Sequence, residues 1–110
     1  MKTFSVITPV YFNEASIPYL VPRLKALADR LPEYAFEFIF VDDGSRDGSF
    51  DLLAQEQARD SRIKIIKLSR NFGSMAAIQA GLQHATGDCA GILAADLQEP
   101  PELFIEMLQR

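Results

Sequence analysis

The sequence lacks several features that would place it in a special class of protein. Its single cysteine, Cys89, cannot form an internal disulfide, which is consistent with a reducing compartment. No apolar run approaches the ~20 residues that a membrane-spanning helix needs, and a strand-like run stands where a signal peptide would begin. Basic runs are missing too, and the formal net charge of −4 argues against nucleic-acid binding. We therefore expect a cytoplasmic protein without a nucleic-acid partner.

What the sequence does contain is enough for one folded unit. It has 110 residues, of which 48% are hydrophobic, and it shows no repeat, linker or low-complexity segment. The last ten residues follow a helical pattern that ends without a C-cap glycine. We therefore expect residues 1–110 to be one domain that is truncated at its C-terminus.

Strand and helix patterns alternate along the chain. Stretches rich in β-branched and aromatic residues predict strands at 4–10, 36–41, 63–68 and 90–95. Apolar spacings of three and four predict helices at 14–31, 49–59, 74–85 and from 101 onward. Pro18 and Pro22 favour a later start for the first helix, and Asp47 or Ser49 can cap the second. This alternation predicts an α/β fold with a parallel, Rossmann-like sheet flanked by helices.

Acidic residues follow two of the predicted strands. Asp42 and Asp43 close the second strand directly before a Gly-Ser turn, and Asp96 follows the fourth. An Asp-Gly turn explains Asp43 but leaves Asp42 without a structural reason. Because the carboxyl ends of parallel strands share one sheet edge, these acids should converge on a polar ligand or a metal ion.

Three further side chains belong to the same predicted edge. Tyr11 offers a flat stacking face, although Asn13 and Glu14 beside it are also suited to a helix start. Arg70 suits a base carbonyl or a phosphate, and it could equally pair with a neighbouring acid. Gly73 either breaks the strand before the helix or exposes helix N–H groups to an anion.

Of the remaining residues that could bind a metal ion, one is a candidate ligand and two are expected to have no role in metal binding. Asp96, close to Gln98, is the candidate contact for Mg²⁺ or Mn²⁺, with water and substrate phosphates as the other ligands. A helix N-cap is the alternative role for Asp96. His84 lies in a predicted helix without a ligand partner at metal spacing, and Cys89 begins a strand that we expect to be buried and inert.

Four motifs in order closely resemble family 2 glycosyltransferases, nearest to the branch that transfers sugars to dolichol or polyprenyl phosphates. They lie at residues 6–14, 41–49, 68–73 and 95–101. The resemblance covers essentially the whole chain. It implies a GT-A fold of which this chain is the N-terminal, nucleotide-binding half. Two departures are Ala94, where the family usually has a first Asp of an Asp-x-Asp pair, and Phe12, which interrupts Tyr-Asn-Glu and shifts Asn13 and Glu14 by one place.

The resemblance also implies roles for the candidate residues. Pro9, Tyr11 and Glu14 would line the nucleoside site. Asp42 and Asp43 would bind the base or the ribose.

The other implied roles concern the base, the metal and the acceptor. Arg70 would flank the base, Asp96 would hold the divalent ion, and Gln98 would lie near the sugar or the phosphates. The implied reaction is inverting transfer from a UDP- or GDP-type sugar to a polyprenyl phosphate, at the cytoplasmic face of a membrane and in cell-envelope glycan synthesis. The acceptor half of the family's site, and with it any catalytic residue, follows this region, so we expect the isolated chain to bind a nucleotide weakly at most and to transfer no sugar.

Two other classes remain open from the residues alone. A receiver-like signalling domain has similar length and acids at strand ends, but its acidic pair follows the first strand, where this chain has Pro9 to Tyr11. A non-catalytic nucleotide-binding sheet module could instead pair with a second copy and so form a homo-oligomer.

Overall fold

The computed structural model describes residues 2–11, 15–44, 47–70 and 72–92. Its elements follow the predicted alternation: β1 (Lys2–Val10), α1 (Ile17–Arg30), β2 (Tyr34–Asp42), α2 (Ser49–Arg59), β3 (Ile63–Lys67), α3 (Ser74–His84) and β4 (Cys89–Ile92). The prediction for these seven elements is confirmed. The end of the predicted fourth strand and the helix predicted from residue 101 lie outside the described residues.

The four strands form one parallel sheet in the order β3-β2-β1-β4. At the carboxyl edge, the register places Val10 beside Asp42 and Asp42 beside Lys67. A parallel sheet needs crossover connections, and the helices provide them. This arrangement confirms the predicted α/β, Rossmann-like fold class, and it brings the carboxyl ends of β1, β2 and β3 to one edge.

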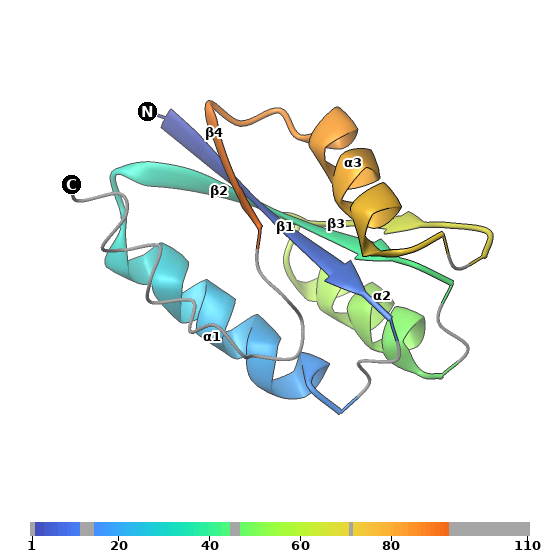
Figure 1. Cartoon of the computed structure of the whole chain (residues 1–110). Helices are drawn as coiled ribbons and strands as arrows, with labels where there is room; N and C mark the ends of the chain where they lie inside the picture. Colours follow the sequence, from blue (N-terminus) through green and yellow to red (C-terminus); the bar gives the residue numbers. More distant parts are fainter. Residues whose placement is uncertain (1, 12–14, 45–46, 71, 93–110) are drawn as a thin grey trace.

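Helices cover both faces of the sheet, with α1 and α2 on one side and α3 on the other (Figure 1). The alternation of side chains along each strand separates the core into two clusters. Val6, Phe38 and Phe40 pack with the apolar residues of α1 and with Leu53 of α2. Ile7 and Ile39 pack with Ala77 of α3 on the opposite face. Both faces of β1 and β2 are therefore buried, as their nearly continuous apolar sequence requires.

The first helix begins at Ile17 rather than at residue 14. Pro18 lies in its first turn, where the missing N–H would have no intrahelical partner and the fixed φ of proline suits the helix. Pro22 lies inside the helix with its ring exposed. The later start that the two prolines predict is confirmed.

Cys89 is exposed, which corrects the expectation that it begins a buried strand. Within the described part of the sheet, β4 is an edge strand that pairs only with β1. Three of its four residues are exposed. An apolar composition alone does not distinguish a central strand from an edge strand, and the prediction was wrong for this reason.

A buried carboxylate joins three strands near the amino end of the sheet. Glu37 of β2 is only 5% exposed, and it accepts hydrogen bonds from the Ser5 hydroxyl at 2.8 Å and from the Thr86 backbone N–H at 3.0 Å. The Thr86 hydroxyl at 2.9 Å and the Lys64 ammonium complete the set. Burial alone raises the pKa of Glu37, but these hydrogen bonds outweigh it and lower the pKa from 4.5 to about 2.

Candidate functional site

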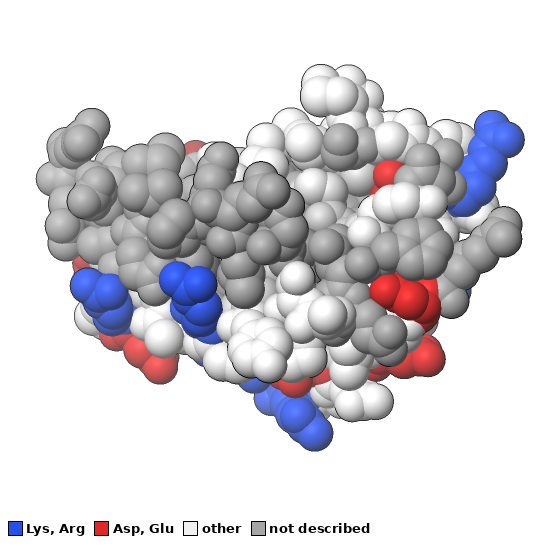
Figure 2. Space-filling view, turned by 60° about the horizontal axis from the view of Figure 1, so that its bottom comes forward, with Lys and Arg blue, Asp and Glu red and all other residues white. Residues whose placement is uncertain are grey.

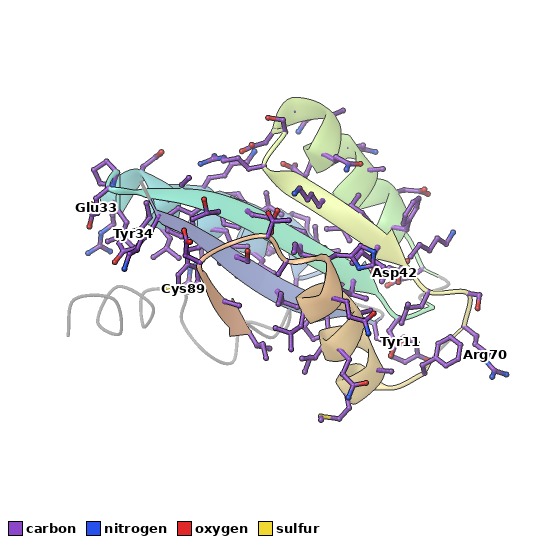
Figure 3. The ribbon with its side chains drawn as sticks, turned by 90° about the horizontal axis from the view of Figure 1, so that it is seen from above. Tyr11, Glu33, Tyr34, Asp42, Arg70 and Cys89 are labelled. Carbon is purple, nitrogen blue, oxygen red and sulfur yellow. The ribbon has the colours of Figure 1, made fainter. Side chains whose placement is uncertain are left out.

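The candidate residues in the described part of the chain gather at one end of the sheet. Tyr11, Asp42 and Arg70 lie at the same end, and Glu33, Tyr34 and Cys89 lie at the other (Figure 3). Pro9 is the next-to-last residue of β1 and therefore belongs to the same edge. The sequence prediction that strand ends far apart in the chain share one edge is confirmed for these residues.

Asp42 forms the last position of β2 and is completely buried. Its backbone carbonyl accepts a hydrogen bond from the Leu68 N–H at 2.9 Å, and the next N–H, of Asp43, donates to the Val10 carbonyl at 2.8 Å. These bonds continue the ladder one step beyond the strands on both sides. The acidic pair is thus built on a rigid part of the sheet and not on a loose loop.

Asp43 binds the backbone that leads into α3. One carboxylate oxygen accepts the Phe72 N–H at 2.8 Å and the other accepts the Gly73 N–H at 3.0 Å. Its side chain faces the α3 side of the sheet and the residue is 3% exposed. Gly73 has φ of 98°, a left-handed conformation that favours glycine. The two N–H groups that Asp43 accepts precede α3, so they are not the helix N–H groups of the second role predicted for Gly73.

Two exposed aromatic rings flank this end of the molecule. Tyr11 and Phe72 are each 48% exposed. The Arg70 guanidinium lies 4.8 Å from the centre of the Phe72 ring. The sequence analysis singled out Tyr11 and Arg70 but missed Phe72. The available signal was an aromatic residue shortly after a strand end, the same feature that marked Tyr11.

The start of α2 also lies at this edge. The helix is capped by the backbone of Gly48 without a side-chain cap bond, which corrects the expected cap at Asp47 or Ser49. The Asp47 carboxylate still accepts the Ser49 N–H at 3.0 Å. Asp47 stands one residue too early for the cap position, so it bonds two residues ahead as a turn residue does.

The metal-binding prediction rests on Asp96, which lies outside the described residues. Glu14, predicted for the nucleoside site, and Gln98, predicted near the sugar or the phosphates, also lie outside them. The described residues contain no group of three or more His, Cys, Asp or Glu side chains that could hold a metal ion. Both oxygens of Asp43 already accept backbone N–H groups. The described residues therefore do not form a metal site by themselves.

Charged side chains of both signs lie on one face of the molecule (Figure 2). On the face shown in Figure 2, the coloured Lys, Arg, Asp and Glu residues are interspersed, and none of the blue areas is continuous. Within the described ranges, no helix is both long enough and apolar enough to span a bilayer.

A family model for "Glycosyl transferase family 2" matches residues 5–110. The chain belongs to this family. Membership confirms the resemblance read from the four sequence motifs, and it disfavours a receiver-like signalling domain.

Curated relatives named as sugar transferases are 43% to 46% identical to this chain over the aligned residues. It is 43% identical over 107 residues to the uncharacterized glycosyltransferase YkcC of Bacillus subtilis, which covers 97% of this chain and 33% of the relative. It is 46% identical over 107 residues to an undecaprenyl-phosphate 4-deoxy-4-formamido-L-arabinose transferase of Pseudomonas aeruginosa, covering 96% and 31%. The chain thus spans about a third of the length of these relatives.

Several solved structures have the same fold as this chain. TarS 1–349 of S. aureus matches with a TM-score of 0.75 at 25% identity, over 99% of this chain and 32% of that one. TarS 1–349 in complex with UDP-GlcNAc matches with a TM-score of 0.74 at 26% identity. The match covers 99% of this chain and 30% of the TarS chain. The mannosyltransferase PcManGT of Pyrobaculum calidifontis, in complex with GDP-Man and Mn²⁺, matches with a TM-score of 0.73. The match covers 84% of this chain and 27% of PcManGT, and at 22% identity it shows the fold alone.

Proposed function

We propose that this family 2 chain is the donor-binding part of a glycosyltransferase that transfers a sugar from a nucleotide-diphosphate sugar to a polyprenyl phosphate, with inversion. The observation that carries the proposal is the convergence of Tyr11, Asp42 and Arg70 at the carboxyl edge of a parallel sheet, where open α/β sheets bind ligands. The undecaprenyl-phosphate transferases among the relatives support the acceptor class.

In this proposal, the exposed side chains make the first contacts with the nucleotide. Tyr11 provides a stacking face, and Arg70 flanks the base or a phosphate with its planar guanidinium. Pro9 and Glu14 line the nucleoside side of the site. The acids Asp42 and Asp43 belong to its buried inner wall, because they are 0% and 3% exposed.

A divalent cation, Mg²⁺ or Mn²⁺, is part of the same proposal and depends on Asp96. The other ligands would be water and the diphosphate of the donor, as is common for Mg²⁺ sites with one or two carboxylates. Such an ion would neutralise charge on the departing diphosphate. Gln98 would lie near the sugar or the phosphates. The cytoplasmic face of a membrane is the proposed location of the whole protein, because the apolar chain of a polyprenyl phosphate anchors this acceptor in a membrane. Pairing with a second copy of the chain stays a prediction, which sedimentation would test.

Thermal stabilisation by nucleotides tests the proposal on the chain itself. We expect millimolar UDP or GDP, or one of their sugar conjugates, to raise the Tm, and Mn²⁺ to increase the shift. A ligand at about ten times its Kd adds roughly 1.4 kcal/mol, which corresponds to a rise of about 6 °C in a domain of this size. Tyr11→Ala and Arg70→Ala should reduce the shift.

Matched controls come from other exposed residues. Tyr19→Ala removes a ring that is 69% exposed on α1, and Arg30→Ala removes a guanidinium at the other end of that helix. Both controls should leave the nucleotide shift unchanged. A Tm that no nucleotide raises would refute the proposal, and equal shifts in Tyr11→Ala and Tyr19→Ala would show that the site is elsewhere.

A further inference from the structure

We propose that Phe72 is a positioning residue of the donor site: its ring holds the Arg70 guanidinium in the orientation from which Arg70 binds an oxygen of the nucleotide. This inference rests on the proposed function and deepens it, because it gives a role to a residue that the sequence analysis missed. Asp43 stays a nucleotide-binding residue in this proposal. The accepting oxygen belongs to a base carbonyl or to a phosphate, since both suit the same planar cation.

The two side chains form a cation–π contact within the candidate site. The central carbon of the Arg70 guanidinium lies over the Phe72 ring, 4.8 Å from its centre, and such contacts are attractive within about 6 Å. Arg70 lies at the same end of the molecule as Tyr11 and Asp42 (Figure 3). Arg70 is exposed and the Phe72 ring is 48% exposed. The pair is therefore accessible from solvent at the edge where we place the nucleotide.

The ring is the fixed member of the pair. The Phe72 backbone N–H donates to one oxygen of the Asp43 carboxylate at 2.8 Å, and the Gly73 N–H donates to the other at 3.0 Å. Asp43 is only 3% exposed, so these bonds tie the main chain at Phe72 to the end of the sheet. A phenylalanine ring has few torsions beyond that point, whereas a long arginine side chain has much rotamer freedom to lose. The ring therefore guides the guanidinium, and not the reverse.

A ring orients a guanidinium without neutralising it. A carboxylate would accept the N–H donors of arginine and compensate its charge, whereas a ring attracts the cation through its quadrupole. Among the ion pairs that the structure shows within the described residues, none includes Arg70. Of the two roles that the sequence left open for Arg70, this arrangement favours binding of a ligand oxygen over pairing with a neighbouring acid. The charge of Arg70 is thus available to the nucleotide.

Loss of the ring should weaken nucleotide binding by a modest and predictable factor. An exposed cation–π contact favours the held orientation by about two- to fivefold, and the apparent affinity follows the fraction of the chain in the competent state. Phe72→Leu keeps an apolar side chain but has no π face, so it should raise the Kd for UDP and GDP by about two- to fivefold. Phe72→Tyr keeps the face and should bind both as the native chain does.

A double-mutant cycle distinguishes positioning through Arg70 from direct contact of the ring with the nucleotide. NMR titration of the 110-residue chain with UDP and with GDP measures each Kd. In Arg70→Ala, the further change Phe72→Leu should leave the Kd unchanged, because the ring then has no guanidinium to hold. The side-chain signals of Arg70 give an independent readout. The ring should shift them in the native chain, and Phe72→Leu should remove that shift.

Tyr19→Leu is the matched control, because it also replaces an exposed ring with leucine, but on α1, which covers the opposite face of the sheet from α3 (Figure 1). It should change neither the Kd nor the Arg70 signals. Titration with uridine, which lacks the phosphates, identifies the accepting oxygen. An effect of Phe72→Leu on UDP alone assigns Arg70 to the phosphates, and an equal effect on uridine assigns it to the base. Phe72→Met replaces Phe72→Leu if the leucine variant does not fold.

The outcomes separate the inference from the proposed function. An equal rise of the Kd on loss of the ring in the native chain and in Arg70→Ala would mean that the ring contacts the nucleotide itself. No rise in either would mean that the ring has no part in binding. Each of these results overturns the inference while nucleotide binding stands. If neither UDP nor GDP binds the native chain, the proposed function fails and the inference fails with it.

Discussion

Glu37 and Asp43 stand six residues apart on the same face of the second strand and its extension, and their carboxylates hold the two ends of α3. Asp43 accepts N–H groups just before the helix begins, and Glu37 accepts the Thr86 N–H and hydroxyl just after it ends. Six strand residues span about 20 Å, slightly more than the ~16 Å of an 11-residue helix. One strand thus fixes both the position and the direction of the helix that packs against it.

The Glu37 carboxylate should be important for stability because four donors depend on it. Glu37→Gln keeps the shape but removes the charge opposite Lys64 and one acceptor, so we expect a loss of about 2–4 kcal/mol in the free energy of unfolding. Urea denaturation followed by circular dichroism measures it. Glu33→Gln, at an exposed position near the same end of the sheet, should cost almost nothing. A cost for Glu37→Gln as small as that of Glu33→Gln would contradict the role of the network.

The same residue predicts how stability depends on pH. The pKa of Glu37 is lowered to about 2 in the folded chain, so its contribution is fully present above its unfolded pKa near 4.5 and is lost as the pH falls toward 2. The lowering of this pKa from 4.5 to about 2 corresponds to a contribution of about 3 kcal/mol to the free energy of unfolding. Asp60 also contributes stability that is lost as the pH falls, because the Arg62 guanidinium lowers its pKa to about 2. Thermal melts from pH 6 to pH 2 should show a falling Tm, with a smaller slope in Glu37→Gln.

Gly87→Ala should disturb the junction of β1 and β4. An added Cβ would stand 2.5 Å from the Ser5 hydroxyl oxygen and 2.8 Å from the Thr3 carbonyl oxygen, and the latter belongs to the backbone and cannot rotate away. Gly73→Ala is the comparison, since its Cβ meets nothing within 4 Å but its φ is strained. We expect Gly73→Ala to lower the free energy of unfolding by about 1–2 kcal/mol and Gly87→Ala to lower it by more, as measured by urea denaturation. A larger loss for Gly73→Ala than for Gly87→Ala would mean that the clash at Gly87 relaxes easily.

The exposed position of Cys89 predicts a reactive surface thiol. It is the only cysteine, and it lies on the edge strand of the described sheet. We expect a thiol-specific reagent such as DTNB to modify the native chain in one fast phase, at a rate close to that of the urea-unfolded chain. A native rate many times slower would show that another segment or a second copy covers β4.

The proposed cation gives a prediction that depends on one residue. Mn²⁺ should strengthen UDP or GDP binding to the chain, and EDTA should abolish the gain. Mn²⁺ should not change the affinity of Asp96→Asn for the nucleotide, and that affinity should equal the one of the native chain in EDTA. Isothermal titration calorimetry measures these affinities. Asp51→Asn, which also removes one carboxylate but from the exposed surface of α2, should keep the Mn²⁺ response.

The amino-acid sequence by itself determined the order of strands and helices, the family, and the edge of the sheet to which the candidate residues belong. Each of these follows from local or periodic signals: β-rich runs, apolar spacing, proline positions and acids placed at strand ends. Tyr11 and Arg70 could be assigned to one end of the molecule because parallel connections leave no other choice.

Only the tertiary structure decided which partner each polar group has. Asp43 has Phe72 and Gly73 as donors, 29 and 30 residues away, and Glu37 binds Thr86, 49 residues away. No periodicity links such positions, because the contacts arise when α3 packs across β2 and β1. Whether β4 lies at an edge, and hence whether Cys89 is exposed, depends on the strand order, which pairing between distant segments sets and local composition does not encode.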